Sequence, residues 1–183
     1  MSKTNSLHYK LCLEGAKWLI KQKYTHGGCK RKKCYQTGAC GGCHKYKYVA
    51  VEICTWNNEH TDVWGLGSFN ESVIIEVKTS RADFIADSRK WCRNEQAANI
   101  GRQAGTMRWF LCPEYLIKDN ELPEKWGLLY YDGKKIYPVK APIKFENTAA
   151  ADIDILTSIL RRERFPNKIF NYRGQPTTIK HKH

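Results

Sequence analysis

The segment 72–78, Ser-Val-Ile-Ile-Glu-Val-Lys, constrains the fold of this chain more than any other stretch. Its β-branched apolar residues predict a strand, and a strand this apolar is typically covered on both faces of a sheet. Side chains alternate between the two faces of a strand, so Glu76 and Lys78 point the same way. Burying an acid and an amine is costly unless they pair with each other or bind a metal. The segment therefore predicts a site with paired or metal-bound charges at a partly buried sheet edge.

A second carboxylate is expected beside Glu76. The segment 61–66 is another predicted strand, and its short connection to 72–78 makes the two strands antiparallel neighbours. Asp62 can then lie next to Glu76, and two carboxylates on adjacent strands form an oxygen-rich pocket suited to Mg²⁺ or Mn²⁺. Such an ion activates water and polarises a phosphodiester, while Lys78 would orient that water or stabilise the growing negative charge. The alternative is an ordinary ion pair between Glu76 and Lys78, with Asp62 in a turn.

The rest of the pattern predicts an α/β fold with a central mixed sheet flanked by helices. The predicted helices are 6–24, 80–100 and 149–164, and the predicted strands are 49–55, 61–66, 72–79, 108–112, 127–131 and 135–139. Ser80 and Asp83 resemble a capping box at the start of the second helix. The last helix is expected to bury Ile153, Leu156 and Leu160. We expect a single domain over 1–170, followed by a basic tail, 171–183.

The spacing of the charged residues resembles a known nuclease signature. Asp62, thirteen intervening residues and then Glu76-Val77-Lys78 is similar to the motif of the PD-(D/E)XK nucleases, with Thr61 at the position of the often-variable Pro. The longer string from Ile75 to Phe84, followed by Asp87, resembles the MmcB-like DNA repair branch of that superfamily. The resemblance implies a restriction-endonuclease-like core. It also implies metal ligation by Asp62, Glu76 and the backbone carbonyl of Val77, with Lys78 catalytic.

Nucleases of this superfamily often place a further acid at the site, contributed by the first helix. Glu14 matches by position, because it lies on the expected apolar face formed by Leu7, Leu11 and Trp18. A carboxylate on such a face calls for a functional reason, so we favour Glu14 as a fourth catalytic residue. Glu52, near the first strand, is the alternative.

The segment 25–47 is predicted to be an insertion held together by a metal, because it has no apolar periodicity. Four cysteines with short spacings and several glycines favour a structural Zn²⁺ site, whose binding would supply the folding free energy of the loop. The proposed ligands are Cys29, Cys34, Cys40 and Cys43. His26 and His44 are possible substitutes among these ligands. An iron–sulfur cluster is the second possibility, and unliganded or disulfide-paired cysteines are the third.

The charge balance points to a polyanionic partner. The chain has 31 Lys and Arg residues against 18 Asp and Glu residues, a net charge of +13. A surplus of this size favours nucleic acid binding, although a basic protein kept soluble by its charge has the same composition. Part of the surplus lies in the insertion, which predicts DNA contacts from Lys30, Arg31, Lys32, Lys33, Lys45 and Lys47. The interleaved Tyr35, Tyr46 and Tyr48 could stack on bases.

Together these features predict a Mg²⁺- or Mn²⁺-dependent deoxyribonuclease in DNA repair, mobile-element or phage DNA processing. A non-catalytic DNA-binding module with a structural zinc site is the alternative, and RNA in place of DNA stays open. No apolar run has the length of a membrane span and no secretory signal is recognised, so we expect no membrane association and a cytoplasmic location. The sequence leaves the oligomeric state open, with a dimer among the possibilities.

Overall fold

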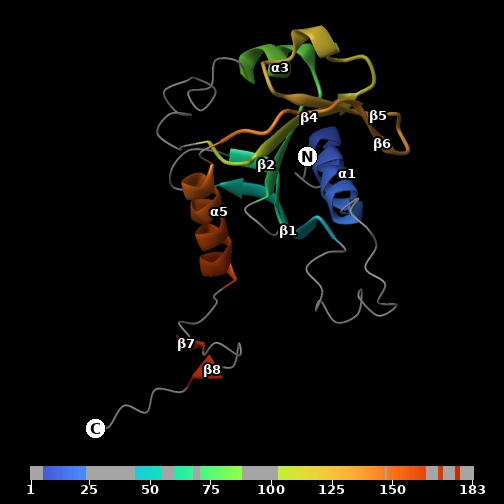
Figure 1. Cartoon of the computed structure of the whole chain (residues 1–183). Helices are drawn as coiled ribbons and strands as arrows, with labels where there is room; N and C mark the ends of the chain where they lie inside the picture. Colours follow the sequence, from blue (N-terminus) through green and yellow to red (C-terminus); the bar gives the residue numbers. More distant parts are fainter. Residues whose placement is uncertain are drawn as a thin grey trace.

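The fold is built on a six-stranded mixed sheet with the order β1-β2-β3-β4-β5-β6 (Figure 1). A computed structural model describes residues 6–23, 44–54, 60–67, 71–87, 103–146 and 148–163, and the backbone of 169–170 and 176–177. The strands of the sheet are β1 (Tyr46–Cys54), β2 (His60–Gly67), β3 (Ser72–Val77), β4 (Met107–Pro113), β5 (Gly127–Tyr131) and β6 (Ile136–Lys140). Strands β1 to β3 pair antiparallel, β3 to β5 pair parallel, and β6 is antiparallel to β5. The predicted α/β class with a central mixed sheet is confirmed.

Helices cover both faces of this sheet. The helices are α1 (Leu7–Lys21), α3 (Arg81–Asp87), the short 3₁₀ helix η3 (Asp119–Glu121) and α5 (Ala149–Arg162). Figure 1 shows α1 and α5 on opposite sides of the strands. The hydroxyl of Ser6 accepts a hydrogen bond from the Tyr9 N–H and begins α1, and Ser80 accepts one from the Asp83 N–H at the start of α3. A separate two-stranded pairing joins β7 (Ile169–Phe170) and β8 (Pro176–Thr177).

Strand β3 lies at the centre of the fold and all its residues are buried. On one face, Val73, Ile75 and Val77 pack with the residues of α1. On the other face, Ile74 packs with Trp64 of β2 and with α5. Each fully buried side chain of this size stabilises the fold by about 1.5–3 kcal/mol relative to exposure. The prediction from 72–78 of a strand covered on both faces is therefore confirmed.

The buried face of α1 differs from the predicted one. Leu11 is buried as expected, but its buried companions are Cys12, Gly15, Ala16 and Leu19. The predicted stripe is wrong at Leu7, which is 47% exposed, and at Glu14, whose side chain is 29% exposed, whereas Trp18 packs against the core from a partly buried position. Neighbouring helix positions are only about 100° apart, and small residues let the helix approach the sheet closely. A Cβ added to Gly15 would lie 3.3 Å from Leu111 Cδ2 of β4.

The predicted face of α5 is also wrong at two of its three positions. Ile153 is 61% exposed and Leu160 is 41% exposed, whereas Leu156 packs against the core from a partly buried position. The residues that turn inward are Asp152, Ile155 and Ser158. Two of these are polar, and a buried carboxylate with hydrogen-bond partners cannot be recognised by apolar periodicity.

The sheet begins earlier than expected. Strand β1 starts at Tyr46, so the last two residues of the predicted 25–47 insertion belong to the sheet. The turn at 68–70, the extension of the second helix through 88–100 and most of the basic tail lie outside the described residues, as do the four predicted zinc ligands. Within the described ranges, no helix is both long and apolar enough to cross a membrane.

Position 105 requires glycine, because its backbone passes too close to β3 for a side chain to fit. It adopts φ +83°, and a Cβ at this position would lie 2.9 Å from Ile74 Cγ1 and 3.1 Å from the Ile74 nitrogen. We expect Gly105→Ala to lower the free energy of unfolding by about 2–4 kcal/mol, since backbone strain and overpacking add. Gly133 is a matched control, because it has φ +93° and open space around its Cα. Gly133→Ala should therefore cost only about 1–2 kcal/mol. Urea denaturation of both variants measures the difference, and equal losses would contradict the packing argument.

Candidate active site

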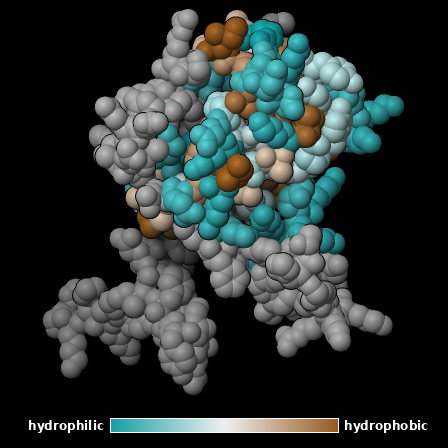
Figure 2. Space-filling view, turned by 45° about the horizontal axis from the view of Figure 1, so that its top comes forward, coloured by the Kyte–Doolittle hydropathy of each residue, from teal (hydrophilic) through white to brown (hydrophobic). Residues whose placement is uncertain are grey.

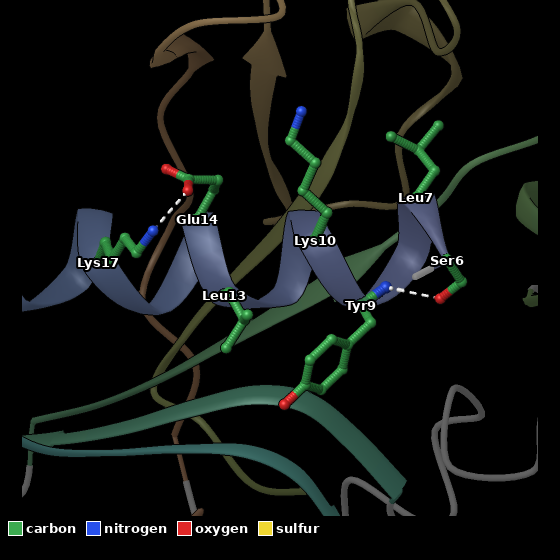
Figure 3. Close-up of a pocket in the computed structure, with 7 residues that line it drawn as sticks. All are labelled: Ser6, Leu7, Tyr9, Lys10, Leu13, Glu14 and Lys17. Atoms are coloured by element: carbon green, nitrogen blue, oxygen red, sulfur yellow. Dashed lines mark hydrogen bonds and ion pairs between the residues drawn. The ribbon is translucent and has the colours of Figure 1, made fainter. Parts of the chain in front are cut away.

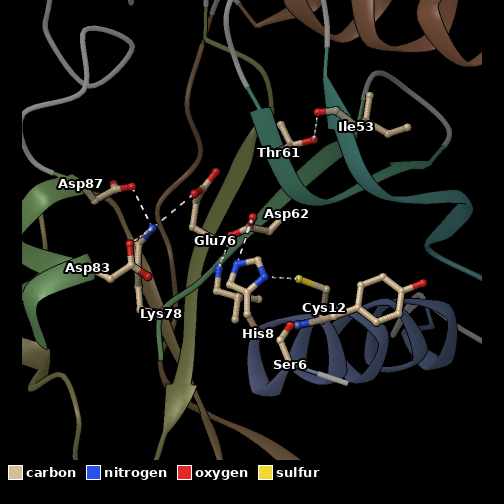
Figure 4. A network of polar contacts seen from close by, with 12 residues as sticks. Ser6, His8, Cys12, Ile53, Thr61, Asp62, Glu76, Lys78, Asp83 and Asp87 are labelled. Atoms are coloured by element: carbon tan, nitrogen blue, oxygen red, sulfur yellow. Dashed lines mark hydrogen bonds and ion pairs between the residues drawn. The ribbon is translucent and has the colours of Figure 1, made fainter. Parts of the chain in front are cut away.

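The candidate site lies at the end of the sheet where β2 and β3 stop pairing. The paired register ends at Val63 opposite Ile75, one residue before Asp62 and Glu76. Beyond that point the Asp62 side chain bridges the strands, and its Oδ2 accepts a hydrogen bond of 2.7 Å from the Val77 N–H. The register thus places Asp62 and Glu76 opposite each other, as predicted. Figure 4 shows both carboxylates at this end of the sheet.

Lys78 lies among three carboxylates (Figure 4). Its Nζ is 2.9 Å from Asp87 Oδ1, 3.6 Å from Glu76 Oε2 and 3.9 Å from Asp83 Oδ1. Glu76, Lys78 and Asp87 are almost completely buried, and Asp83 is at the surface. Asp83 and Asp87 come from successive turns of α3, which therefore turns an acidic face towards Lys78. Lys78 therefore lies in an acidic environment formed by β3 and α3.

Helix α1 brings His8 and Cys12 to Asp62 from the opposite side. Nε2 of His8 lies 3.3 Å from Asp62 Oδ1, and Nδ1 of the same ring lies 3.6 Å from Cys12 Sγ. The hydrogen bond with Asp62 raises the pKa of His8 above its ordinary value, with smaller contributions from the charges of Asp62, Glu52 and Asp83. Burial raises the pKa of Cys12, so its thiol is protonated at neutral pH.

Glu14 and Glu52 occupy different surroundings. Glu14 is on the outer part of α1, where its Oε1 lies 2.7 Å from Lys17 Nζ (Figure 3). Both residues are among the seven that line an open hollow of about 520 Å³ along the helix. Glu52 is on β1 between residues paired with Val63 and Thr61, which puts it opposite Asp62 on the neighbouring strand. It also has a positive φ of 50°, which is uncommon for Glu. The arrangement favours Glu52, the alternative acid, over Glu14.

The oxygen donors at this end of the sheet fit a hard divalent cation. Asp62 and Glu76 provide carboxylates from paired strands, and Val77 provides a backbone carbonyl between Glu76 and Lys78. Carboxylate and carbonyl oxygens are the ligands that Mg²⁺ and Mn²⁺ prefer. The Asp62 side chain is 19% exposed, whereas Glu76 and Val77 are buried, so solvent reaches this donor set from the Asp62 side.

Comparisons with known proteins add little to this geometry. No protein-family model matches the chain, and no curated protein matches it. A solved structure with a similar fold is the SPO1766 protein of unknown function from Silicibacter pomeroyi, with 24% sequence identity and a TM-score of 0.47. The match covers 63% of this chain and 76% of that one. No family follows from it.

Two of the predicted DNA-contacting residues can be placed. Lys45 lies directly before β1, with its Nζ 5.6 Å from the ring centre of Tyr46, and Lys47 is exposed on the strand. Tyr46 is buried beneath α1, so its proposed role in stacking on bases is wrong, whereas Tyr48 is 62% exposed. The other four basic residues of the set, together with the four cysteines, lie outside the described residues. Figure 2 shows hydrophilic residues over much of the described surface seen there, with hydrophobic residues in separate spots.

The sequence predicted that the first helix contributes Glu14 to the site. It did not identify the four residues that α1 and α3 bring there. His8 and Cys12 are four residues apart, as are Asp83 and Asp87, and this spacing puts each pair on one helix face. The spacing was therefore visible as a pattern. What it could not show is that both faces turn towards the ends of β2 and β3.

Proposed function

We propose that this protein is a Mg²⁺- or Mn²⁺-dependent nuclease that hydrolyses phosphodiester bonds in DNA. The observation that supports it most is the meeting of Asp62, Glu76 and Lys78 where β2 and β3 separate. The proposal also draws on the resemblance of their spacing to the PD-(D/E)XK signature. Strand ends at which side chains from several elements meet are common positions for active sites.

Each residue has a distinct role in this proposal. Asp62, Glu76 and the Val77 carbonyl would hold the ion, which supplies an activated water and withdraws charge from the phosphodiester. Lys78 would stabilise the negative charge that develops on the phosphate oxygens. Asp87 and Asp83 are positioning residues, because their carboxylates hold the Lys78 ammonium at the end of β3.

The choice of nucleic acid as substrate rests on charge. The net charge of +13 favours association with a polyanion, and Lys45 and Lys47 add positive charge next to the sheet. DNA is proposed over RNA because of the motif resemblance alone.

The decisive experiment incubates the whole protein with single-stranded, duplex and branched DNA, and with matching RNA, in Mg²⁺ or Mn²⁺. We expect metal-dependent cleavage of at least one DNA substrate, and a loss of about 10²-fold or more in Asp62→Asn. The nuclease proposal would be abandoned if the wild-type protein bound these substrates and gave no products with either ion.

One observation favours the non-catalytic alternative. The carboxylate of Glu76 and the ammonium of Lys78 are both almost fully buried and lie 3.6 Å apart, as in a structural ion pair. A DNA-binding module that kept this pair for stability would bind the same substrates. The cleavage assay separates the two functions, because only the nuclease yields shortened strands.

A further inference from the structure

We propose that His8, Cys12 and Asp62 form a second metal site, which takes a zinc-like divalent ion and competes with the catalytic ion for Asp62. The part of this proposal that concerns competition rests on the nuclease function, and the site itself does not. Nothing in the motif resemblance assigns a role to His8 or Cys12.

The geometry of the three side chains fits such an ion. One ligand atom from each of them can be chosen so that all three lie within 4.8 Å of one another. Among the described residues, no other group of three or more His, Cys, Asp or Glu residues meets this limit. Zinc bonds of about 2.0–2.3 Å in a tetrahedron put ligand atoms roughly 3.3–3.8 Å apart. Cys12 Sγ lies 3.6 Å from Nδ1 of His8, which is already in that range. Asp62 Oδ1 lies 3.3 Å from the other ring nitrogen, Nε2. Because His8 binds one ion through one nitrogen, a small side-chain rotation must bring the three ligand atoms, which already lie within 4.8 Å of one another, to tetrahedral spacing.

The chemistry of the ligands separates this site from the proposed magnesium site. A thiolate and an imidazole are soft or borderline donors and favour Zn²⁺, Co²⁺ or Fe²⁺, whereas Mg²⁺ favours oxygen. Asp62 suits both kinds of ion. When the ion binds, the metal–sulfur bond replaces the S–H bond of Cys12 and the proton leaves to solvent, while His8 binds through a neutral nitrogen.

The position of the group also allows an ion to enter. Cys12 is fully buried on the inner face of α1, but the side chain of His8 is 33% exposed and that of Asp62 is 19% exposed. An ion can therefore arrive from the His8 side, and a water can complete a four-coordinate shell. Once bound, it would hold Asp62 from the α1 side and withdraw that carboxylate from the ion shared with Glu76.

Metal stoichiometry tests the site without reference to nuclease activity. The full-length wild-type protein, Cys12→Ala and His8→Gln would each be saturated with Zn²⁺, freed of excess metal and analysed for zinc per chain. We expect both variants to hold about one ion per chain fewer than wild type. Any zinc bound by the four cysteines of 29–43 is present in all these proteins, so it does not change the difference in zinc content between wild type and variant.

Cys112→Ala is the matched control. Cys112 is as fully buried as Cys12, and burial raises its pKa to about 12, but it is not in the His8 and Asp62 group. We expect this variant to bind as much zinc as wild type. A second readout is the difference in Co²⁺ absorption between wild type and Cys12→Ala, which should contain a thiolate-to-cobalt band. If Cys12→Ala does not fold, the zinc content of His8→Gln tests the site, because His8 is partly exposed and its replacement disturbs the core less.

Equal zinc content in wild type, His8→Gln and Cys12→Ala would overturn the site. The competition is tested separately, as the ratio of cleavage rates with and without Zn²⁺ in excess Mg²⁺. That ratio should be several-fold lower for wild type than for His8→Gln. Lower zinc content in the variants together with equal ratios would overturn the competition and keep the site. Lower zinc content in a protein that cleaves nothing would keep the site and reject the nuclease.

Discussion

Replacing Glu76 by Gln is expected to lower the rate of metal-dependent DNA cleavage by about 10³-fold while the protein stays folded. Gln has the size of Glu and keeps an oxygen for Lys78, but it lacks the negative charge that holds a divalent cation. The loss should appear in the cleavage step, with DNA binding almost unchanged. Single-turnover cleavage kinetics and a binding titration in Ca²⁺ measure the two effects.

Glu124→Gln is the control for this variant. Glu124 is exposed, and its replacement makes the same change in net charge. It should leave the cleavage rate within about twofold of wild type, which would assign the loss in Glu76→Gln to the site. Cleavage by Glu76→Gln at the wild-type rate would remove Glu76 from the catalytic role.

Lys78→Ala is a poorer test of catalysis, because the structure gives Lys78 a part in stability. Its ammonium lies between the buried carboxylates of Glu76 and Asp87. Removing it would leave two buried acids without the cation between them, and breaking such a pair commonly costs about 3–5 kcal/mol. A loss of cleavage in this variant could then reflect unfolding alone.

Asp152→Ala is expected to lower the free energy of unfolding by about 3–5 kcal/mol. Asp152 on α5 is buried, and its carboxylate accepts hydrogen bonds from the Trp64 Nε1–H at 2.9 Å, the Ser72 hydroxyl at 2.6 Å and the Gly105 N–H at 3.1 Å. These donors come from β2, β3 and the segment before β4, so one side chain joins α5 to the sheet. Alanine would leave all three donors buried without this acceptor. Chemical denaturation followed by circular dichroism measures the loss.

Asp154→Ala on the same helix is the comparison, because Asp154 is only partly buried. Its replacement should cost less than about 1 kcal/mol. A similar small loss for Asp152→Ala would mean that water replaces the carboxylate, and that this network does not hold α5 in place.

The same residue predicts a pH dependence. Burial raises the pKa of Asp152 above the ordinary aspartate value, and its hydrogen bonds only partly offset that shift. Between the ordinary value, about 4, and the higher folded value, the folded state binds more protons than the unfolded state. The stability of wild type relative to Asp152→Asn should therefore fall as the pH rises through this interval, and then become constant. Denaturation of both proteins from pH 3.5 to 7 would show it, and a rising difference would contradict the assignment.

Local sequence patterns predicted much of the fold. The β-branched run of β3 and the cap at Ser80 each depend on residues a few positions apart. Strand alternation likewise predicted that Asp62 and Glu76 come opposite each other, because it needs only the register of two neighbouring strands.

The sequence by itself therefore determined the central strand, its burial on both faces, and the meeting of Asp62, Glu76 and Lys78. Only the tertiary structure decided which helix faces turn towards them. In that structure, His8 and Cys12 of α1 lie beside Asp62, and Glu14 pairs with Lys17. Helix α3 contacts Lys78 through Asp87. A helix can turn either of two adjacent stripes inward, and the choice depends on the fit of side chains to a sheet assembled from distant segments. Periodicity within a single helix does not contain that information.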